Sequence, residues 1–216
     1  MTQKTSSIML VDDHPLLRKG LQQLIELSDG LKLVAQANSG AEALELGVEL
    51  DPDLILLDLN MQGMNGLETL EKLRAAGVTS RIVMLTVSDA DADVIGAISR
   101  GADGYLLKDM EPEELLTQIE RALQGKMVMS EAVTQALATA IRRPQQSHQA
   151  KLENLTGREL EILKLIAKGL SNKLIARELD ISDGTVKVHV KHLLKKLGLR
   201  SRVEAAVWMI NQEKGE

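Results

Sequence analysis

Acidic, hydroxyl and ammonium side chains stand directly after four short apolar runs in the first half of the chain. Asp12 and Asp13 follow IMLV, Asp58 follows LILL, Thr86 follows IVML and Lys108 follows GYLL. Carboxylates that are crowded together repel one another unless a cation or a proton lies among them. Oxygen ligands alone suit a hard divalent ion, so the three acids predict a Mg²⁺ site.

A carboxylate in such a site can also attack a phosphoryl group and form an acyl phosphate. Asp58 is the candidate nucleophile, because it ends the most apolar run and this run indicates a central strand. Asp13, with Asp12, would hold the metal. Lys108 would pair with the phosphate as a point charge, and Thr86 would donate its hydroxyl to it. One acid after a strand is most often a cap or a turn residue, but five such groups together favour a reactive site.

The apolar runs alternate with amphipathic segments, which predicts five β-α units. Continuous apolar strands are typical of a parallel sheet covered on both faces, here a flavodoxin-like doubly wound α/β fold. Such sheets bind ligands outside the carboxyl ends of their strands. The expected strands are 8–11, 33–35, 54–57, 82–85 and 104–107, and the expected helices are 15–27, 41–50, 67–75, 93–100 and 112–123. The first helix is expected to bury one face made of Leu16, Leu17, Leu21, Leu24 and Ile25.

The organisation changes after this α/β half. A helix is expected over 130–141, and the polar segment RRPQQSHQ at 142–149 predicts a linker. From 154 onward the pattern is wholly helical, and Thr156 with Glu159 fits a capping box. We therefore expect an α/β domain over 1–127, a linker with a helix over 128–153 and an all-α domain over 154–216.

Two helices of the last domain, 172–179 and 183–197, are joined by a tight turn and predict a helix-turn-helix. The second helix carries a basic face, which suits phosphates and base edges in the major groove. Its members are Lys187, Lys191, Lys195 and Lys196. Residues 1–131 carry a net charge of −11 and residues 151–216 a net charge of +4, which indicates two domains with different partners.

Composition excludes several classes of protein. The 216 residues contain no Cys, so disulfide frameworks and thiolate metal sites are excluded. No apolar run approaches the roughly 18 residues that span a bilayer, and the first residues lack the apolar centre of a signal peptide. Tyr105 and Trp208 are the only aromatic residues, which argues against binding single strands by base stacking. These features predict a cytoplasmic protein.

Four segments of the α/β half carry a resemblance to a known family. VDDHP, LLDLNMQGMNG, LTVSD and GADGYLLKD resemble the response-regulator receiver domain, over about residues 7–125. The resemblance implies that a membrane sensor histidine kinase phosphorylates Asp58. It implies that the backbone carbonyl of Asn60 is a further Mg²⁺ ligand beside Asp12, Asp13 and Asp58. Thr86 and Tyr105 would change position when the phosphate arrives, and Lys108 matches the lysine of the family.

Two positions depart from the receiver pattern. Gln62 stands where the family often has Pro, which affects the stiffness of a turn. Lys108 is followed by Asp109, where the family often has a cis proline, so the geometry of that loop stays open. Neither departure removes a reacting group.

The helical half resembles the LuxR-type helix-turn-helix over about residues 153–213, through LTGRE, GLSNKLIA and TVKVHVKH. The resemblance implies that one helix enters the major groove with Lys187, Val188 and Lys191, next to Lys195 on its basic face. It places Asn172 and Lys173 near the DNA backbone, where a helix N-terminus favours phosphate. The last helix would form a dimer contact through Val203, Ala206, Val207 and Ile210, whereas Trp208 would pack internally.

Together the two resemblances predict a phosphorylation-activated, DNA-binding transcription regulator of a two-component system. The motifs GLSNKLIA and TVKVHVKH are similar to those of nitrate- and nitrite-responsive members, which implies a kinase with that signal. In such proteins the unphosphorylated receiver covers the recognition helix, and phosphorylation uncovers it. The chain would then be no enzyme, although it accepts phosphate on Asp58 and removes it again by autodephosphorylation.

Two other classes of protein stay open at this point. A phosphatase or phosphotransferase of the haloacid dehalogenase type also uses an aspartate nucleophile, but it needs a second acid two residues later, where this chain has Asn60. A flavodoxin-like binding module would hold a flavin, but acidic strand ends repel its phosphate. Turnover of phosphomonoesters or a coloured protein would favour these readings.

Overall fold

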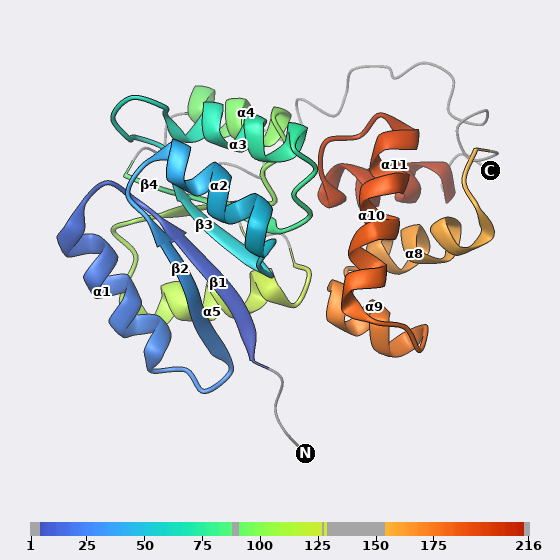
Figure 1. The fold of residues 1–216 in the computed structure, drawn as a ribbon, viewed down its shortest axis with the longest axis horizontal. Helices are drawn as coiled ribbons and strands as arrows, with labels where there is room; N and C mark the ends of the chain where they lie inside the picture. Colours follow the sequence, from blue (N-terminus) through green and yellow to red (C-terminus); the bar gives the residue numbers. More distant parts are fainter. Residues whose placement is uncertain (1–4, 88–90, 127, 129–153, 214–216) are drawn as a thin grey trace.

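The chain forms an α/β unit and a helical unit, which lie side by side (Figure 1). The computed structural model describes residues 5–87, 91–126, 128 and 154–213. The expected helix over 130–141 and the polar segment 142–149 lie outside the described residues, and the domain boundaries stay predictions. None of the described helices combines the length and the apolar character needed to cross a membrane.

The α/β unit is built on a five-stranded sheet with the order β2-β1-β3-β4-β5. All its strand pairs are parallel. The strands are β1 (Ser6–Val11), β2 (Leu31–Ala37), β3 (Leu54–Asp58), β4 (Arg81–Thr86) and β5 (Gly104–Leu107). Strand β3 is central and wholly buried, which its apolar run predicted. The expected doubly wound parallel fold is confirmed, although β2 is longer than the segment 33–35, because an edge strand also takes polar residues into its ladder.

Helices cover both faces of this sheet (Figure 1). They are α1 (Pro15–Glu26), α2 (Gly40–Leu50), α3 (Gly66–Ala75), α4 (Asp91–Ser99) and α5 (Pro112–Leu123). Side chains alternate along each strand: Met9 and Val11 pack with α2, α3 and α4, whereas Ile8 and Leu10 pack with α1 and α5. The strands are therefore apolar on both sides, as in other sheets with two helical layers.

The prediction that Leu16 belongs to the buried face of α1 is wrong. Leu16 is 87% exposed, whereas Leu21 and Ile25 lie in the core and Leu17 and Leu24 pack against it. Consecutive helical residues are about 100° apart at 3.6 residues per turn, so Leu16 and Leu17 cannot share one narrow face.

The helical unit consists of α8 (Gly157–Ala167), α9 (Asn172–Glu178), α10 (Asp183–Leu197) and α11 (Arg202–Glu213). Hydroxyl side chains begin three of these helices: Thr156, Ser171 and Ser182 each accept a hydrogen bond from the backbone N–H three residues later. The predicted capping box of Thr156 and Glu159 is confirmed. Trp208 is 4% exposed and packs inside this unit. The helices α9 and α10 form the expected helix-turn-helix.

Replacing Glu159 by Gln is expected to destabilise the helical unit. Its carboxylate accepts from the Thr156 N–H at 2.8 Å and pairs with Lys196 at 2.6 Å. Burial alone raises the pKa of Glu159, but Lys196 and Thr156 outweigh burial and lower it. A lowered pKa adds stability above the ordinary value of 4.5, and this stability is lost as the pH falls through the lowered value.

At neutral pH we expect the free energy of unfolding to fall by about 0.5–2 kcal/mol, the range for a lost cap. Fluorescence of Trp208, the only Trp, reports unfolding of this unit. In acid below the lowered pKa, the variant and the wild type should converge. Glu161→Gln is the control, because Glu161 is 57% exposed and its ion pair contributes little. An equal loss in both variants contradicts a specific role for Glu159.

Candidate functional site

The polar residues singled out in the first half lie at one edge of the sheet. Asp12 and Asp13 follow the end of β1, Asp58 ends β3, Thr86 ends β4 and Lys108 follows β5. These strands are parallel neighbours, so their carboxyl ends meet at the same edge. Gly66 supports this edge from the start of α3, because a Cβ there would lie 2.1 Å from the carbonyl oxygen of Asp58.

Lys108 connects the two buried acids of the site. Its Nζ lies 2.7 Å from Asp12 Oδ2 and 2.9 Å from Asp58 Oδ1. The backbone N–H of Asn60 donates to the same Asp58 oxygen at 3.2 Å. Asp12 and Asp58 are 0% and 1% exposed. Lys108 is therefore placed to hold a negative group at Asp58.

Electrostatics at Asp58 favour the arrival of a positive charge. Burial raises the pKa of Asp58, the hydrogen bond from Lys108 lowers it, and the charge of Asp12 raises it; the net pKa is raised. The raised pKa means that burial and the charge of Asp12 destabilise the Asp58 carboxylate by more than the Lys108 ammonium group stabilises it. A divalent cation among these acids would remove that cost.

The free oxygens of the site fit a hard divalent ion. Among the described residues, Asp58 Oδ2 and Asp13 Oδ1 are buried and have no hydrogen-bond partner. Asp13 Oδ2 is held by the backbone N–H of Gln62 at 3.0 Å. One atom from each of Asp12, Asp13, His14 and Asp58 lies within 4.8 Å of the others. Such an oxygen-rich cluster suits Mg²⁺.

The remaining predicted residues lie around this cluster. Thr86 and Tyr105 are 0% and 2% exposed, so both side chains are enclosed. Lys108 donates its backbone N–H to the Thr86 carbonyl at 2.8 Å, which ties the ends of β4 and β5 together. No cis peptide bond occurs in the described part of the chain, so the Lys108–Asp109 bond is trans. Gln62 lies exposed in the turn where the family often has Pro.

The helical unit places its predicted DNA contacts on two helices. Val188 on α10 is 53% exposed, and Lys191 and Lys195 are exposed. Asn172, at the start of α9, is instead 9% exposed and accepts a hydrogen bond from Arg202 at 3.0 Å. On α11, Val203, Ala206 and Val207 are half-buried and Ile210 is 37% exposed, so the predicted dimer stripe is partly open.

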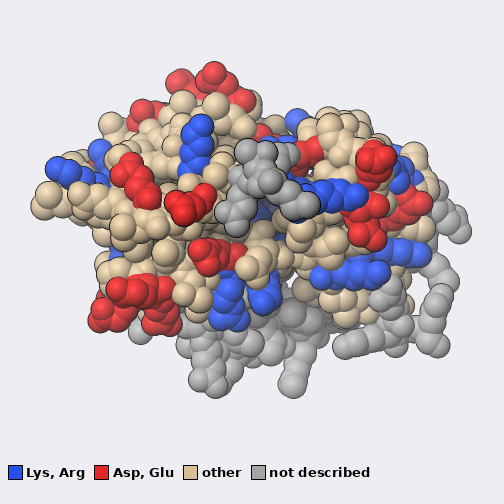
Figure 2. Space-filling view, turned by 90° about the horizontal axis from the view of Figure 1, so that it is seen from below, with Lys and Arg blue, Asp and Glu red and all other residues tan. Residues whose placement is uncertain are grey.

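Basic residues of the helical unit contact the α/β unit. Lys173 Nζ lies 2.6 Å from Asp53 Oδ2 and donates to the Thr5 carbonyl at 2.9 Å. Lys187 Nζ donates to the Asp51 carbonyl and lies 3.8 Å from the Asp51 carboxylate. Burial raises the pKa of Asp53, but hydrogen bonds from Lys173 and Ser7 outweigh it and lower the pKa. Lys and Arg side chains lie near the junction of the units in Figure 2.

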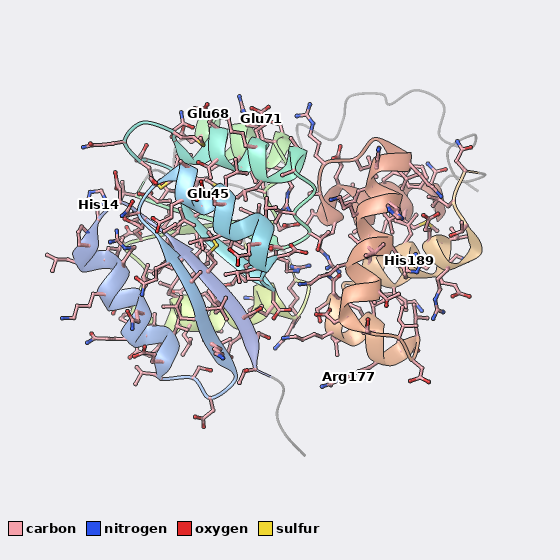
Figure 3. The ribbon with its side chains drawn as sticks, in the orientation of Figure 1. His14, Glu45, Glu68, Glu71, Arg177 and His189 are labelled. Atoms are coloured by element: carbon pink, nitrogen blue, oxygen red, sulfur yellow. The ribbon has the colours of Figure 1, made fainter. Side chains whose placement is uncertain are left out.

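Further contacts extend this junction. Lys191 Nζ donates to the Ala76 carbonyl at 3.4 Å, and Arg200 donates to the Ser99 carbonyl at 3.1 Å. The accepting residues lie before β1, β3 and β4 and at the end of α4 before β5, so they lie at the amino-terminal edge of the sheet. The acidic site lies at the opposite edge. His14, which lies within 3.3 Å of Asp12 and Asp13, stands at the far side of the α/β unit from the helical unit (Figure 3).

The backbones of the units also touch directly. A Cβ built on Gly125 would lie 1.3 Å from the carbonyl oxygen of Gly169. Sequence reasoning missed this pair and the acids Asp51 and Asp53. Glycines after helices and acids before strands are common helix ends and caps, so each had a local explanation.

Similarity to known proteins agrees with this geometry. Residues 8–120 match the response regulator receiver domain, and residues 153–209 match the bacterial regulatory proteins of the luxR family. The chain is 56% identical to the nitrate/nitrite response regulator protein NarL of Escherichia coli strain K12, over 98% of both chains. It is 52% identical to the nitrate/nitrite response regulator protein NarP of the same strain, over 95% of this chain and 94% of NarP.

The crystal structure of the response regulator ChrA, from a heme-sensing two-component system, is also similar. Its TM-score is 0.51 and its identity 33%, over 97% of this chain and 98% of ChrA. The matched ranges include the residues of the acidic site and of the helix-turn-helix. The chain belongs to the response regulators of two-component systems, and it is a phosphorylation-dependent, DNA-binding transcription regulator with a luxR-type C-terminal unit.

Proposed function

We propose that phosphorylation of Asp58 releases helix α10 from the α/β unit, and that the released helix binds promoter DNA in response to nitrate and nitrite. The observation that carries this proposal is the position of Lys187 and Lys191. Both belong to the predicted DNA-reading face, and both contact the amino-terminal edge of the sheet. The same face cannot contact DNA while it is closed in this way.

The chemistry at Asp58 follows from its neighbours. A carboxylate oxygen of Asp58 attacks the phosphorus of a phosphohistidine on the sensor kinase; the phosphorus–nitrogen bond breaks and the imidazole leaves with its electron pair. Lys108 lies within 2.9 Å of Asp58 and holds the new negative charge. Asp12, Asp13, Asp58 and the Asn60 carbonyl would hold Mg²⁺, which would supply positive charge beside the transferring oxygens. Thr86 donates its hydroxyl to the phosphate, and Tyr105 moves with it.

The alternative of a dehalogenase-type phosphatase finds no support at the site. Position 60, two residues after the nucleophile, carries an amide that cannot protonate a leaving group. In the proposed function, Asp58 accepts one phosphoryl group and loses it by hydrolysis, and the protein does not turn over small phosphate esters.

Phosphorylation must act across the sheet. Asp58 ends β3, and Asp53 directly precedes the same strand. A five-residue strand is roughly 17 Å long, so the phosphate does not touch the junction. We infer that the strand ends and the helices between them shift together and weaken the junction. The coupling of two such sites is typically worth about 1–3 kcal/mol.

Asp53→Asn is expected to strengthen DNA binding by the unphosphorylated protein by a few-fold. The change removes the charge that faces Lys173 at 2.6 Å, in a place where both side chains are less than one fifth exposed. An amide oxygen can still accept from Ser7, so the local fold is kept. The affinity for a random-sequence duplex at low salt measures the effect. Asp29→Asn removes the same charge from an exposed turn, and equal gains in both variants contradict the proposal.

In the wild type, a phosphodonor is expected to raise DNA affinity and to steepen its salt dependence. Release frees Lys173, Lys187 and Lys191 for phosphate contacts. Each phosphate contact changes the slope of log affinity against log salt by about −0.9, so the slope should steepen by about 2 to 3. An unchanged slope contradicts release of this face.

The partners follow from the same proposal. The phosphodonor is a membrane sensor histidine kinase that detects nitrate and nitrite, supported by the similarity to NarL and NarP. The protein acts in the cytoplasm, and it binds DNA as a dimer whose two copies contact each other through Val203, Ala206, Val207 and Ile210. The receiver domain spans 1–127 and the DNA-binding domain 154–216. Phosphotransfer from a nitrate-responsive kinase to the wild type, absent in Asp58→Asn, tests the partner and the signal.

A further inference from the structure

A histidine stands beside the acids of the phosphorylation site. His14 is the residue before α1, and its side chain caps no backbone group of that helix. Its Nδ1 lies 2.8 Å from Asp13 Oδ1 and 3.3 Å from Asp12 Oδ1. The side chain of His14 is 67% exposed, yet its ring lies against two carboxylates.

The side chains of His14 and Asp13 approach each other closely, with His14 Nδ1 lying 2.8 Å from Asp13 Oδ1. Asp13 Oδ1 is buried and has no hydrogen-bond partner in the part of the chain that the structure describes. A separation of 2.8 Å is also that of two ligand atoms that share one ion.

The distances fit an octahedral ion. At a metal–ligand distance of about 2.1 Å, neighbouring ligands are about 3.0 Å apart and opposite ligands about 4.2 Å. The two Nδ1–oxygen distances of 2.8 and 3.3 Å lie on either side of the neighbour value. Atoms of Asp12, Asp13, His14 and Asp58 all lie within 4.8 Å of one another. The unpartnered Oδ2 of Asp58, in a residue 1% exposed, independently points to a bound cation.

We propose that the His14 imidazole is a ligand in this pocket, and that the pocket binds a divalent transition-metal ion such as Mn²⁺ more tightly than Mg²⁺. This inference rests on the metal site of the proposed function and adds a nitrogen donor to it. Imidazole suits transition metals, whereas Mg²⁺ prefers oxygen ligands and keeps its waters. His14 thus favours one class of ion over the other, while the acids accept both.

Pulsed electron paramagnetic resonance of Mn²⁺ bound to the full-length protein tests this proposal. We expect modulation from a coordinated imidazole nitrogen in the wild type and none in His14→Gln. His189→Gln is the matched control, because His189 lies on α10 in the other unit (Figure 3), and it should keep the modulation. Titration should show Mn²⁺ affinity reduced about tenfold in His14→Gln, with Mg²⁺ affinity changed less than twofold.

The outcomes separate the ligand from the site. Mn²⁺ bound by the wild type without nitrogen modulation overturns the role of His14 and leaves the metal site intact. Equal loss of Mn²⁺ and Mg²⁺ affinity in His14→Gln also overturns it, because the histidine then only positions Asp13. A wild type that binds neither ion overturns both the inference and the proposed metal site.

Discussion

Replacing Asp58 by Asn is expected to abolish the response of DNA binding to a phosphodonor. Asn keeps the size of the side chain and an oxygen for Lys108, but its amide does not attack phosphorus. In the wild type the negative charge of Asp12 raises the pKa of Asp58, because the two carboxylates repel each other. The substitution removes this repulsion, so the fold should be kept. In the wild type we expect a gain of about 5- to 150-fold in affinity, the usual range for coupled sites.

A control for Asp58→Asn is a second acid at the same edge of the sheet. Asp109 is exposed and follows Lys108 directly, so Asp109→Asn removes a nearby charge without touching the buried cluster. This control should respond to the phosphodonor like the wild type, with affinities measured on the same duplex. Phosphodonor-enhanced binding that survives Asp58→Asn would falsify the assignment of Asp58.

Gly125→Ala is expected to give DNA binding without phosphorylation. The new Cβ would lie 1.3 Å from the Gly169 carbonyl oxygen, and the three nearest atoms all belong to Gly169. Real Cβ atoms cannot approach backbone so closely, so the units must separate. We expect the unphosphorylated variant to reach roughly the affinity of the phosphorylated wild type, with little further gain from a phosphodonor.

Gly169→Ala provides a control at the same contact. Gly125 and Gly169 have φ values of +99° and +83°, so alanine strains the backbone of both by about 1–2 kcal/mol. A Cβ on Gly169, however, would lie 3.8 Å from the Gly125 oxygen, which is ordinary contact. Both variants should lose thermal stability, but only Gly125→Ala should bind DNA more tightly. Equal DNA affinities in the two variants contradict a steric junction.

The fold and the acidic site could be predicted from the sequence, because they depend on patterns within short segments of the chain. Five apolar runs predicted the strands, and parallel strands bring their carboxyl ends to one edge. Asp12 and Asp58 therefore both lie within 2.9 Å of Lys108, although 96 positions separate Asp12 from Lys108. The family resemblance added Tyr105 and the Asn60 carbonyl, for which spacing alone offered no signal.

The junction between the α/β unit and the helical unit could not be predicted from the sequence, because it depends on how two separately folded units meet. Asp51 illustrates the difficulty: it ends α2 with φ 37° and holds Thr79 and Ser80 through its carboxylate. These local roles explain the residue fully before its contact with Lys187 is considered. The lysines likewise had one explanation as DNA contacts, so their second role needed the assembled structure.

The placement of the acidic site and the junction at opposite edges of the sheet has a thermodynamic consequence for promoters. Because DNA and the phosphoryl group share no atom, each influences the other only through the closed and open populations. Such linkage is reciprocal: the factor by which phosphate favours DNA is also the factor by which DNA favours phosphate. A promoter that holds this protein open will therefore retain its phosphorylated form, and occupied sites will outlast the signal in the surrounding solution.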